Sequence, residues 1–464
     1  MSTTSNRPPG PRGKPLVGVA LELRKHGLNL LARCAREYGD LVYLPLAFGQ
    51  NRLLVSHSDL IEQVLVVQHH KFHKSAMSKA ATGRLLGNGL LNSEGDFWRR
   101  QRRLAQPAFQ KTRVNEYAVT MVEHALAYTA QWRDGEVRDV ADEMSRLTCG
   151  IAVKTLFGID LGAEADRVGE NLTNLMRFQI NRVRSPFRIP ENFPTPANRR
   201  ANAAFQYLDS LVYRIIEERR ARGAGGNDLL SRLISAMDED GTQMTPRQLR
   251  DETMTLFLAG HETTALTLSW TWYLLAQNPS AEARVHEELS RVFAGRASRA
   301  LEAKDGESLS YLDAVIRESL RLYPPAYIVA RVAIEPFDLG GYSFPAGTTI
   351  LMSQWVMHRD PRYFPEPLAF RPERWLDGLA ARLPTHAYFP FGGGPRRCIG
   401  QGFALMEASL VAATLAQRFR FELEPGQTIV PEPLVTLRPR GGIRMRIHAR
   451  GPGIPEKGGF LKNA

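Results

Sequence analysis

The chain has 464 residues, of which 43% are hydrophobic and 23% charged, a composition typical of a globular protein and not of a disordered one. The formal net charge is +12, but the arginines are spread along the chain and no nucleic-acid-binding motif occurs, so we expect no nucleic-acid partner. Its three cysteines are not clustered, which argues against a disulfide framework and suits a reducing cytoplasm.

The N-terminal quarter predicts little helix. Residues 1–15 are rich in proline and glycine, and residues 40–55 are expected to form a β-hairpin. The apolar run 16–21 is too short to span a bilayer and is followed by charge, so we expect neither a signal peptide nor a membrane span. Trp98 lies on a predicted helix that carries a cluster of arginines.

From about residue 115 onward, helical periodicity dominates. The four prolines of residues 181–199 predict a loop, and residues 223–227 a second linker before a short helix from Asp228. A long helix should begin with Thr245 as N-cap and Pro246 as first helical residue, and stop before Pro279.

The last third predicts a helix from about residue 310 to 324, a hairpin over residues 331–350 that turns at Gly340-Gly341, and a helix over about 403–416. We therefore expect a mainly α fold with small β-sheets, organised as a single domain over residues 1–464 with a flexible tail from about 450.

Cys398 is the most informative residue, because it lies in the loop Phe-Gly-Gly-Gly-Pro-Arg-Arg-Cys-Ile-Gly (391–400), just before a predicted helix. The helix N-terminus and the two arginines are expected to lower the pKa of the thiol. A thiolate suits a nucleophile, a zinc ligand or a haem-iron ligand. No CxxC spacing occurs, the His69–His73 spacing has no partner residues, and the loop lacks the Lys-Ser/Thr ending of a phosphate loop. A buried structural cysteine is the plain alternative.

The pattern Phe391, Gly394, Arg396, Cys398, Gly400 resembles the haem-thiolate signature of the cytochrome P-450 family. Three further motifs follow the family's order: Ala-Gly-His-Glu-Thr-Thr (259–264), Glu-Ser-Leu-Arg (318–321) and Pro-Glu-Arg-Trp (372–375). The resemblance extends from Pro8 to the region after Arg440. It implies haem b held between a long distal helix, about 246–277, and a helix of about 400–418 that follows the ligand loop.

The resemblance assigns roles to residues on both sides of the haem. Cys398 would be the axial iron ligand, with Phe391 packed beside it and the N–H groups of Ile399 and Gly400 holding the thiolate. On the distal helix, Ala259 and Gly260 would leave room for the cofactor, and Thr263 can bond back to the Ala259 carbonyl. Thr263 and Glu262 match the pair that delivers protons during dioxygen activation. A close helix crossing is the alternative for this hexapeptide.

The family also suggests contacts to the haem propionates and a structural triad. Trp98 and Arg102 match the Trp-x-x-x-Arg propionate contact, and Arg331 and Arg396 are further candidates. Glu318, Arg321 and Arg374 match the Glu-Arg-Arg triad that supports the ligand loop, although Glu318 and Arg321 alone would usually be a surface ion pair. His358 is interpreted as a structural or surface histidine.

The expected activity is insertion of one oxygen atom from dioxygen into an apolar C–H bond. Electrons would come from NAD(P)H through a separate reductase and a ferredoxin or flavodoxin, since no flavin or iron–sulfur domain follows the haem domain. We expect a soluble, cytoplasmic monomer without a membrane anchor. A peroxide-using peroxygenase or isomerase and a non-enzymatic haem gas sensor are the alternatives. The first does not need the Glu262–Thr263 pair, and the second lacks a signalling domain.

The family suggests an apolar substrate pocket, fit for a fatty acid, a terpene or a steroid, lined by Met77, Leu85, Leu86, Leu90, Met176, Ile180, Phe257, Tyr327, Ile328 and Val329. We favour a fatty acid, whose carboxylate Arg182, Arg184 or Arg188 could hold, although exposed loop arginines are the interpretation that these residues alone favour. On the Trp98 helix, at least two of Arg99, Arg100 and Arg103 should remain in solvent and steer an acidic redox partner.

Overall fold

The computed structural model describes residues 7–46, 51–75, 82–159, 164–184, 190–221, 228–238, 241–293, 301–306 and 308–450. Its α-helices are α1 (Ala20–Tyr38), α2 (Ser58–Glu62), α4 (Gly95–Ala105), α5 (Lys111–Glu116), α6 (Ala118–Thr129), α7 (Val140–Phe157), α8 (Glu164–Arg184), α9 (Pro196–Ala221), α10 (Leu229–Ser235), α11 (Pro246–Gln277), α12 (Pro279–Val292), α13 (Ala303–Gly306), α14 (Ser310–Leu322), α15 (Gln354–Met357), α16 (Glu373–Leu376), α17 (Leu379–Arg382) and α18 (Gln401–Arg418). Short π- and 3₁₀-helical turns are η2 (Gln63–Val67), η3 (His69–Lys71), η4 (Gln106–Phe109) and η5 (Gly394–Arg396).

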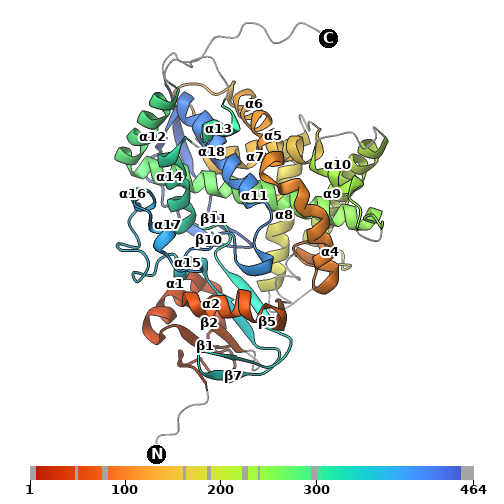
Figure 1. Cartoon of the computed structure of the whole chain (residues 1–464), viewed down its shortest axis with the longest axis vertical. Coiled ribbons are helices and arrows are strands. Elements are labelled where there is room, and N and C mark those ends of the chain that lie inside the picture. The colour runs from red at the N-terminus through yellow and green to blue at the C-terminus, as the bar shows by residue number, and fades with distance from the viewer. Residues whose placement is uncertain are drawn as a thin grey trace, which may run out of the picture.

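The strands form a five-stranded sheet and three smaller ones. The large sheet has the order β1-β2-β8-β5-β3, and the others are β4-β12-β9, β6-β7 and β10-β11. Their bounds are β1 (Leu41–Pro45), β2 (Asn51–Val55), β3 (Phe72–Lys74), β4 (Val137–Asp139), β5 (Val329–Ala333), β6 (Phe337–Leu339), β7 (Tyr342–Phe344), β8 (Thr349–Met352), β9 (Phe419–Leu423), β10 (Pro431–Pro433), β11 (Leu437–Pro439) and β12 (Arg444–Ala449). Most helices gather at one end of the molecule, and the five-stranded sheet lies at the other (Figure 1). The predicted mainly α fold with small sheets is confirmed.

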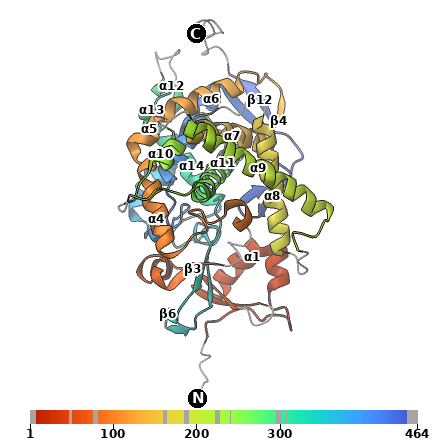
Figure 2. The same cartoon turned by 90° about the vertical axis from the view of Figure 1, so that its right-hand side faces the viewer.

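Helix α11 runs through the centre of the helical part, and Figure 2 shows it surrounded by the other helices. Its start matches the prediction: the Thr245 side chain accepts a hydrogen bond from Gln248 N–H, the Gln248 side chain bonds back to Thr245 N–H, and Pro246 is the first helical residue. The helix packs on α7, α9, α14 and α18, and 24 of its 32 residues are buried. A helix buried along most of its length fixes the positions of the side chains that pack on its neighbours.

The predicted hairpins are also present. Strands β1 and β2 pair antiparallel from Leu41 opposite Val55, and β6 and β7 pair around Gly340 and Gly341. Both glycines have left-handed backbone angles, with φ of 59° and 82°, as a tight hairpin turn requires. Strand β5 pairs antiparallel with β8, which brings the segment after α14 back to the sheet.

Three details differ from the prediction or lie outside it. The loop predicted over residues 181–199 is shorter, because α8 continues to Arg184 and α9 begins at Pro196, where proline is tolerated in a first turn. Helix α1, which buries Leu28, Leu31 and Cys34, was not predicted. The linker predicted at residues 223–227 and the tail after residue 450 lie outside the described residues. Within the part of the chain that is described, no helix is long and apolar enough to cross a membrane.

Candidate functional site

A gap opens on one side of α11 at Ala259. The eight residues before it are buried, but Ala259 itself is exposed, although it lies in the middle of the most enclosed helix. The Thr263 hydroxyl donates to the Ala259 carbonyl at 2.7 Å, which confirms the predicted bond, and Thr264 does the same to Gly260 at 3.1 Å. Side-chain bonds of this kind bend a helix and tilt its carbonyls outward. The helix therefore presents small side chains and the engaged Ala259 carbonyl to an open space, whereas Thr264 is buried.

Glu262, which directly precedes Thr263, is held by two partners, one from β11 and one from the residue before that strand. Its side chain is 5% exposed and forms an ion pair with Arg438 of β11, with 2.6 Å between Glu262 Oε1 and Arg438 Nη2. The hydroxyl of Thr436 donates to the same carboxylate oxygen. The carboxylate is thus charge-compensated and held in place by these two partners. Neither partner was identified from the sequence, because both come from a distant segment with no motif of its own.

The loop of Cys398 is fixed by its backbone. The Cys398 N–H donates to the Phe391 carbonyl at 3.0 Å, and α18 begins at Gln401, as expected for a thiol at a helix N-terminus. Gly394 has a φ of +64°, and a Cβ there would collide with the Leu65 carbonyl oxygen of η2. The glycine at 394 is therefore required for packing the loop on η2, a role that the sequence did not indicate.

The environment of the Cys398 thiol differs from the prediction. Protein atoms surround it on most sides, yet its own surface faces open space, so it is exposed. Burial by the surrounding protein raises the pKa of the thiol above its ordinary value, while the Gly400 N–H, Arg102 and Arg397 lower it by less. The prediction that the pKa of the thiol is lowered is therefore wrong as long as only protein groups act on it. Burial raises the pKa by more than the backbone N–H and the arginines lower it. A bound metal cation would deprotonate the thiol outright.

Three arginines lie beside the loop with a single carboxylate. Arg396 pairs with Glu94, and its guanidinium lies 3.9 Å above the Trp98 ring. Arg102 donates to the Arg397 carbonyl at 2.8 Å. Arg331 is 9% exposed, and burial, reinforced by Arg396, lowers its pKa to about 10. The local charge is thus positive and partly buried.

These residues fit the cofactor that the sequence predicted. Among the described residues, Arg331 has no carboxylate in ion-pair distance, and the buried Arg396 Nη1 has no hydrogen-bond partner. A buried guanidinium without a carboxylate and a buried N–H group without an acceptor are both costly, so an anionic group is expected beside them. Haem propionates are such anions, and the exposed Cys398 thiol and the gap at Ala259 provide a ligand and space. Trp98, Arg102, Arg331 and Arg396 would hold the propionates.

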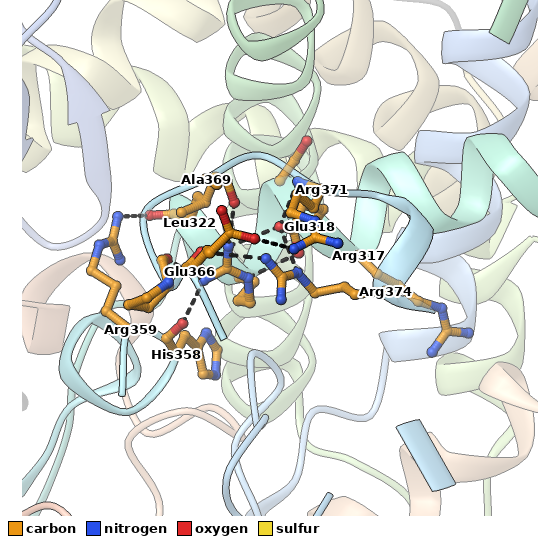
Figure 3. A network of polar contacts seen from close by, with 12 residues as sticks. Arg317, Glu318, Leu322, His358, Arg359, Glu366, Ala369, Arg371 and Arg374 are labelled. Carbon is orange, nitrogen blue, oxygen red and sulfur yellow. Dashed lines mark hydrogen bonds and ion pairs between the residues drawn. The ribbon is translucent and has the colours of Figure 1, made fainter. Parts of the chain in front are cut away.

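The three residues of the predicted triad are in contact, and Figure 3 shows Glu318 and Arg374 of it side by side. Glu318 is fully buried and accepts from Arg321 Nη2 at 2.8 Å and from Arg374 Nε at 3.0 Å. Arg321 also donates to the carbonyls of His358, Pro367 and Ala369 at 2.6–3.0 Å. One carboxylate thus joins α14 to α16 and to the segment between α15 and α16.

Two further residues belong to this network, of which the sequence did not indicate the first and allowed two interpretations of the second. The Trp375 indole N–H donates to Glu318 at 2.9 Å. His358 is buried, and its Nε2 accepts a hydrogen bond from the N–H of Phe389, two residues before the ligand loop, at 3.0 Å. This contact confirms His358 as a structural histidine. Burial and the neighbouring Arg321 and Arg359 lower the pKa of His358 well below its ordinary value, so it stays neutral and can accept this bond.

The residues suggested for the substrate pocket are only partly brought together. Leu85, Leu86 and Leu90 lie along the N-terminal half of α11, where Glu252 accepts the Leu90 N–H at 3.0 Å. Val329 is the first residue of β5 in the large sheet, and both it and Ile328 are half-buried. The Tyr327 hydroxyl donates to the Leu434 carbonyl at 2.8 Å. Met77 lies outside the described residues, and Met176 and Ile180 are described only as part of α8.

The prediction that Phe257 lines the substrate pocket is wrong. It is 3% exposed and packs on Phe157 of α7, with ring centroids 5.7 Å apart, and stacks on His261. Two residues correspond to about 200° around a helix, so Phe257 points away from the gap at Ala259. The Phe257 side chain is part of the hydrophobic core between α11 and α7 and does not line the open side of α11.

The arginines of α4 are less free than predicted. Arg99 and Arg103 are exposed, as expected for at least two of the three, but Arg99 pairs with Asp96, and Arg103 Nη2 lies 2.6 Å from Asp238. Arg100 is 21% exposed and binds Asp238 and Thr242, so it ties α4 to the segment before α11. The helix therefore presents a mixed, not a purely positive, surface.

Comparison with known proteins agrees with this site. The family model described as Cytochrome P450 matches residues 8–444. Cyclooctatin synthase of Streptomyces melanosporofaciens is 38% identical, covering 94% of each chain. Cyclooctat-9-en-7-ol 5-monooxygenase of the same organism is 39% identical over 90% of each chain, and pentalenene oxygenase of Streptomyces avermitilis is 33% identical over 96% of this chain and 97% of its own. The solved structure of retinoic acid-bound cyanobacterial CYP120A1 has a TM-score of 0.83 at 27% identity, covering 96% of this chain and 99% of that one.

A family model that covers nearly the whole chain, with relatives above 30% identity, agrees with the thiol, the gap in α11 and the cationic cluster, and the family's cofactor is haem b. The chain belongs to the cytochrome P450 family and is a P450 monooxygenase.

Proposed function

We propose that this enzyme hydroxylates an apolar terpene. The names of three relatives, cyclooctatin synthase, cyclooctat-9-en-7-ol 5-monooxygenase and pentalenene oxygenase, point to terpene substrates. They favour a terpene over the fatty acid that the sequence alone suggests. The observation that carries the proposal is the similarity to the 5-monooxygenase, which extends over 90% of both chains at 39% identity.

Each side of the site has its own task in this proposal. Haem b bound through Cys398 supplies the chemistry of dioxygen activation. The Cys398 thiolate is the ligand, and the Gly400 N–H and the nearby Arg102 tune it. Arg331, buried and without an ion-pair partner among the described residues, would hold a propionate. Loss of the ligand tests the assignment: Cys398→Ser should abolish the red-shifted absorption band of the reduced, carbon monoxide-treated protein, and survival of that band would contradict it.

Protons would reach the reacting oxygen through Thr263. Its hydroxyl is bonded to the Ala259 carbonyl in the resting protein and faces the open side of α11. A hydroxyl can donate its own proton while accepting another, so Thr263 can pass protons without ionising. Glu262 would resupply it after leaving Arg438 and Thr436, whose contacts keep the carboxylate in place between turnovers.

Electrons would come from a ferredoxin or flavodoxin that docks near α4 and the ligand loop. The exposed guanidinium groups of Arg99, Arg103 and Arg397 lie on or beside these elements. Because Asp96 and Asp238 compensate part of this charge, we expect weak, salt-sensitive steering. Arg100 is excluded from the docking surface, since its side chain binds Asp238 and Thr242.

The proposal is tested with the haem-loaded enzyme, a surrogate ferredoxin and reductase, NADPH and isotopically labelled dioxygen. Terpene hydrocarbons and alcohols, fatty acids and steroids form the substrate panel, and substrate-induced shifts of the haem absorption band report binding. We expect a terpene product that carries one labelled oxygen atom. Turnover with peroxide but not with NADPH would favour the peroxygenase alternative, and turnover of fatty acids but not of terpenes would overturn the substrate class.

A further inference from the structure

Two arginines from different parts of the chain converge on Glu191. Arg84, in the segment before α4, places Nη1 2.9 Å from Glu191 Oε2, and Arg182, near the end of α8, places Nε 3.5 Å from Glu191 Oε1. Glu191 lies in the connection between α8 and α9. The three side chains are only 23–34% exposed, so solvent screens this cluster less than an open surface pair.

The segment that carries Arg84 continues into two residues that the sequence suggested for the substrate pocket. Leu85 and Leu86 directly follow Arg84, and their carbonyls bond to α11, to Arg250 Nη1 at 2.9 Å and to Thr255 Oγ1 at 3.5 Å. Thr255 is one helical turn before Ala259. The segment that carries Arg84 is therefore tied to the same helix that opens at Ala259.

Both guanidinium groups also rest on aromatic rings. The Arg84 guanidinium lies 4.6 Å from the Phe205 ring centroid of α9 and donates to Asn202 Oδ1 at 2.6 Å. The Arg182 guanidinium lies 5.7 Å from the ring centroid of Phe178. These contacts hold the two cations in place independently of Glu191, so the cations would persist if its charge were removed.

Two fixed cations beside apolar residues of the proposed pocket are what a long-chain carboxylate would bind. In this chain a carboxylate of the protein itself already occupies them. A substrate carboxylate would have to displace Glu191 or accept its repulsion, whereas an uncharged substrate has nothing to displace.

We propose that Glu191 is a specificity-determining residue that fills the Arg84–Arg182 pair and thereby excludes substrates carrying a carboxylate. The inference rests on the proposed function, because it concerns which apolar molecules enter that same pocket. It predicts that one uncharged, nearly isosteric replacement, Glu191→Gln, converts the edge of the pocket into an anion site.

The experiment compares dodecanoate with dodecan-1-ol, which differ in the head group. Binding to the haem-loaded enzyme is measured by equilibrium dialysis and by the shift of the haem absorption band. Glu191→Gln should bind dodecanoate about tenfold more tightly than the unaltered enzyme, because partly exposed charge pairs contribute up to about fivefold each. Its affinity for dodecan-1-ol should not change, and the gain should shrink as salt is added.

Glu164→Gln is the matched control. Glu164 pairs with Arg214 at 2.8 Å and also links α8 to α9, but it does not contact Arg84 or Arg182. A purely structural role of Glu191 predicts equal effects of both variants on the two ligands. Adding Arg84→Gln to Glu191→Gln should remove most of the gain, and Arg84→Gln alone should weaken dodecanoate relative to dodecan-1-ol even if Glu191→Gln fails to fold.

The two proposals fail in different ways. An unchanged acid-to-alcohol ratio in Glu191→Gln, or an equal change in Glu164→Gln, overturns the role of Glu191 whatever the enzyme oxidises. If the ratio changes as expected but no terpene is oxidised, the substrate class proposed above is wrong and the role of Glu191 stands.

Discussion

Replacing Glu318 by alanine removes the carboxylate that two buried guanidinium groups share. Glu318 is fully buried, Arg321 is fully buried, and the Arg374 side chain is 7% exposed. The Arg371 N–H and the Trp375 indole N–H also donate to this carboxylate, each at 2.9 Å. The variant would leave two cations uncompensated and two further donors without their acceptor.

The cost follows from these contacts. Breaking a buried ion pair by removing one partner costs about 3–5 kcal/mol. Each buried donor left unsatisfied adds about 1–3 kcal/mol. The total of about 5 kcal/mol or more is comparable with the whole stability of many domains, about 5–15 kcal/mol. Because Arg321 bonds the His358 carbonyl and His358 accepts the Phe389 N–H, the loss should reach the segment just before the ligand loop.

The measurement is haem content per purified chain, together with the midpoint of urea unfolding. We expect Glu318→Ala to be haem-poor or insoluble, and Glu318→Gln, which keeps the volume but not the charge, to lie between it and the unaltered protein. Asp313→Ala is the control on the same helix, since Asp313 pairs with Arg317 at 2.5 Å but is 43% exposed, and its loss should cost less than about 1 kcal/mol. A fully haem-loaded Glu318→Ala variant with unchanged unfolding would refute the reasoning.

Three further predictions concern proton delivery, pH and electron transfer. Thr263→Ala should bind haem and substrate normally but release more hydrogen peroxide per NADPH oxidised; an unchanged peroxide yield would exclude its role. Burial raises the pKa of Glu252 from 4.5 to about 7, so the folded chain binds more protons than the unfolded chain between these pH values. The free energy of unfolding should therefore fall as pH rises through this window. Glu252→Gln should remove this loss, about 3 kcal/mol at roughly 1.4 kcal/mol per pH unit, and a pH dependence identical to that of the unaltered protein would contradict it. Arg99→Glu should slow reduction by an acidic ferredoxin at low ionic strength, whereas Arg214→Glu on α9 should not; equal rates in both variants would exclude docking at α4.

The sequence by itself determined the features that depend on neighbours along the chain. The capping box of Thr245 and the bond from Thr263 to the Ala259 carbonyl join residues three or four positions apart, so their chemistry is readable without a fold. The glycine-rich loop before α18 likewise identified Cys398 and, through resemblance, the family. Glu318 and Arg321 taken alone predict a surface ion pair. The Pro-Glu-Arg-Trp motif adds Arg374, and only with it does the sequence predict the triad.

Only the tertiary structure decided features that depend on burial and on partners far along the chain. Glu262 is held by Arg438, Glu191 collects Arg84 and Arg182, and the net pKa shift of Cys398 is upward because the enclosing protein outweighs the nearby helix end. Phe257 faces α7 and not the gap at Ala259. Its position around the helix axis determines which neighbour it contacts, and its hydrophobicity alone does not indicate this. Desolvation and long-range pairing arise when the chain is folded, and no local pattern encodes them.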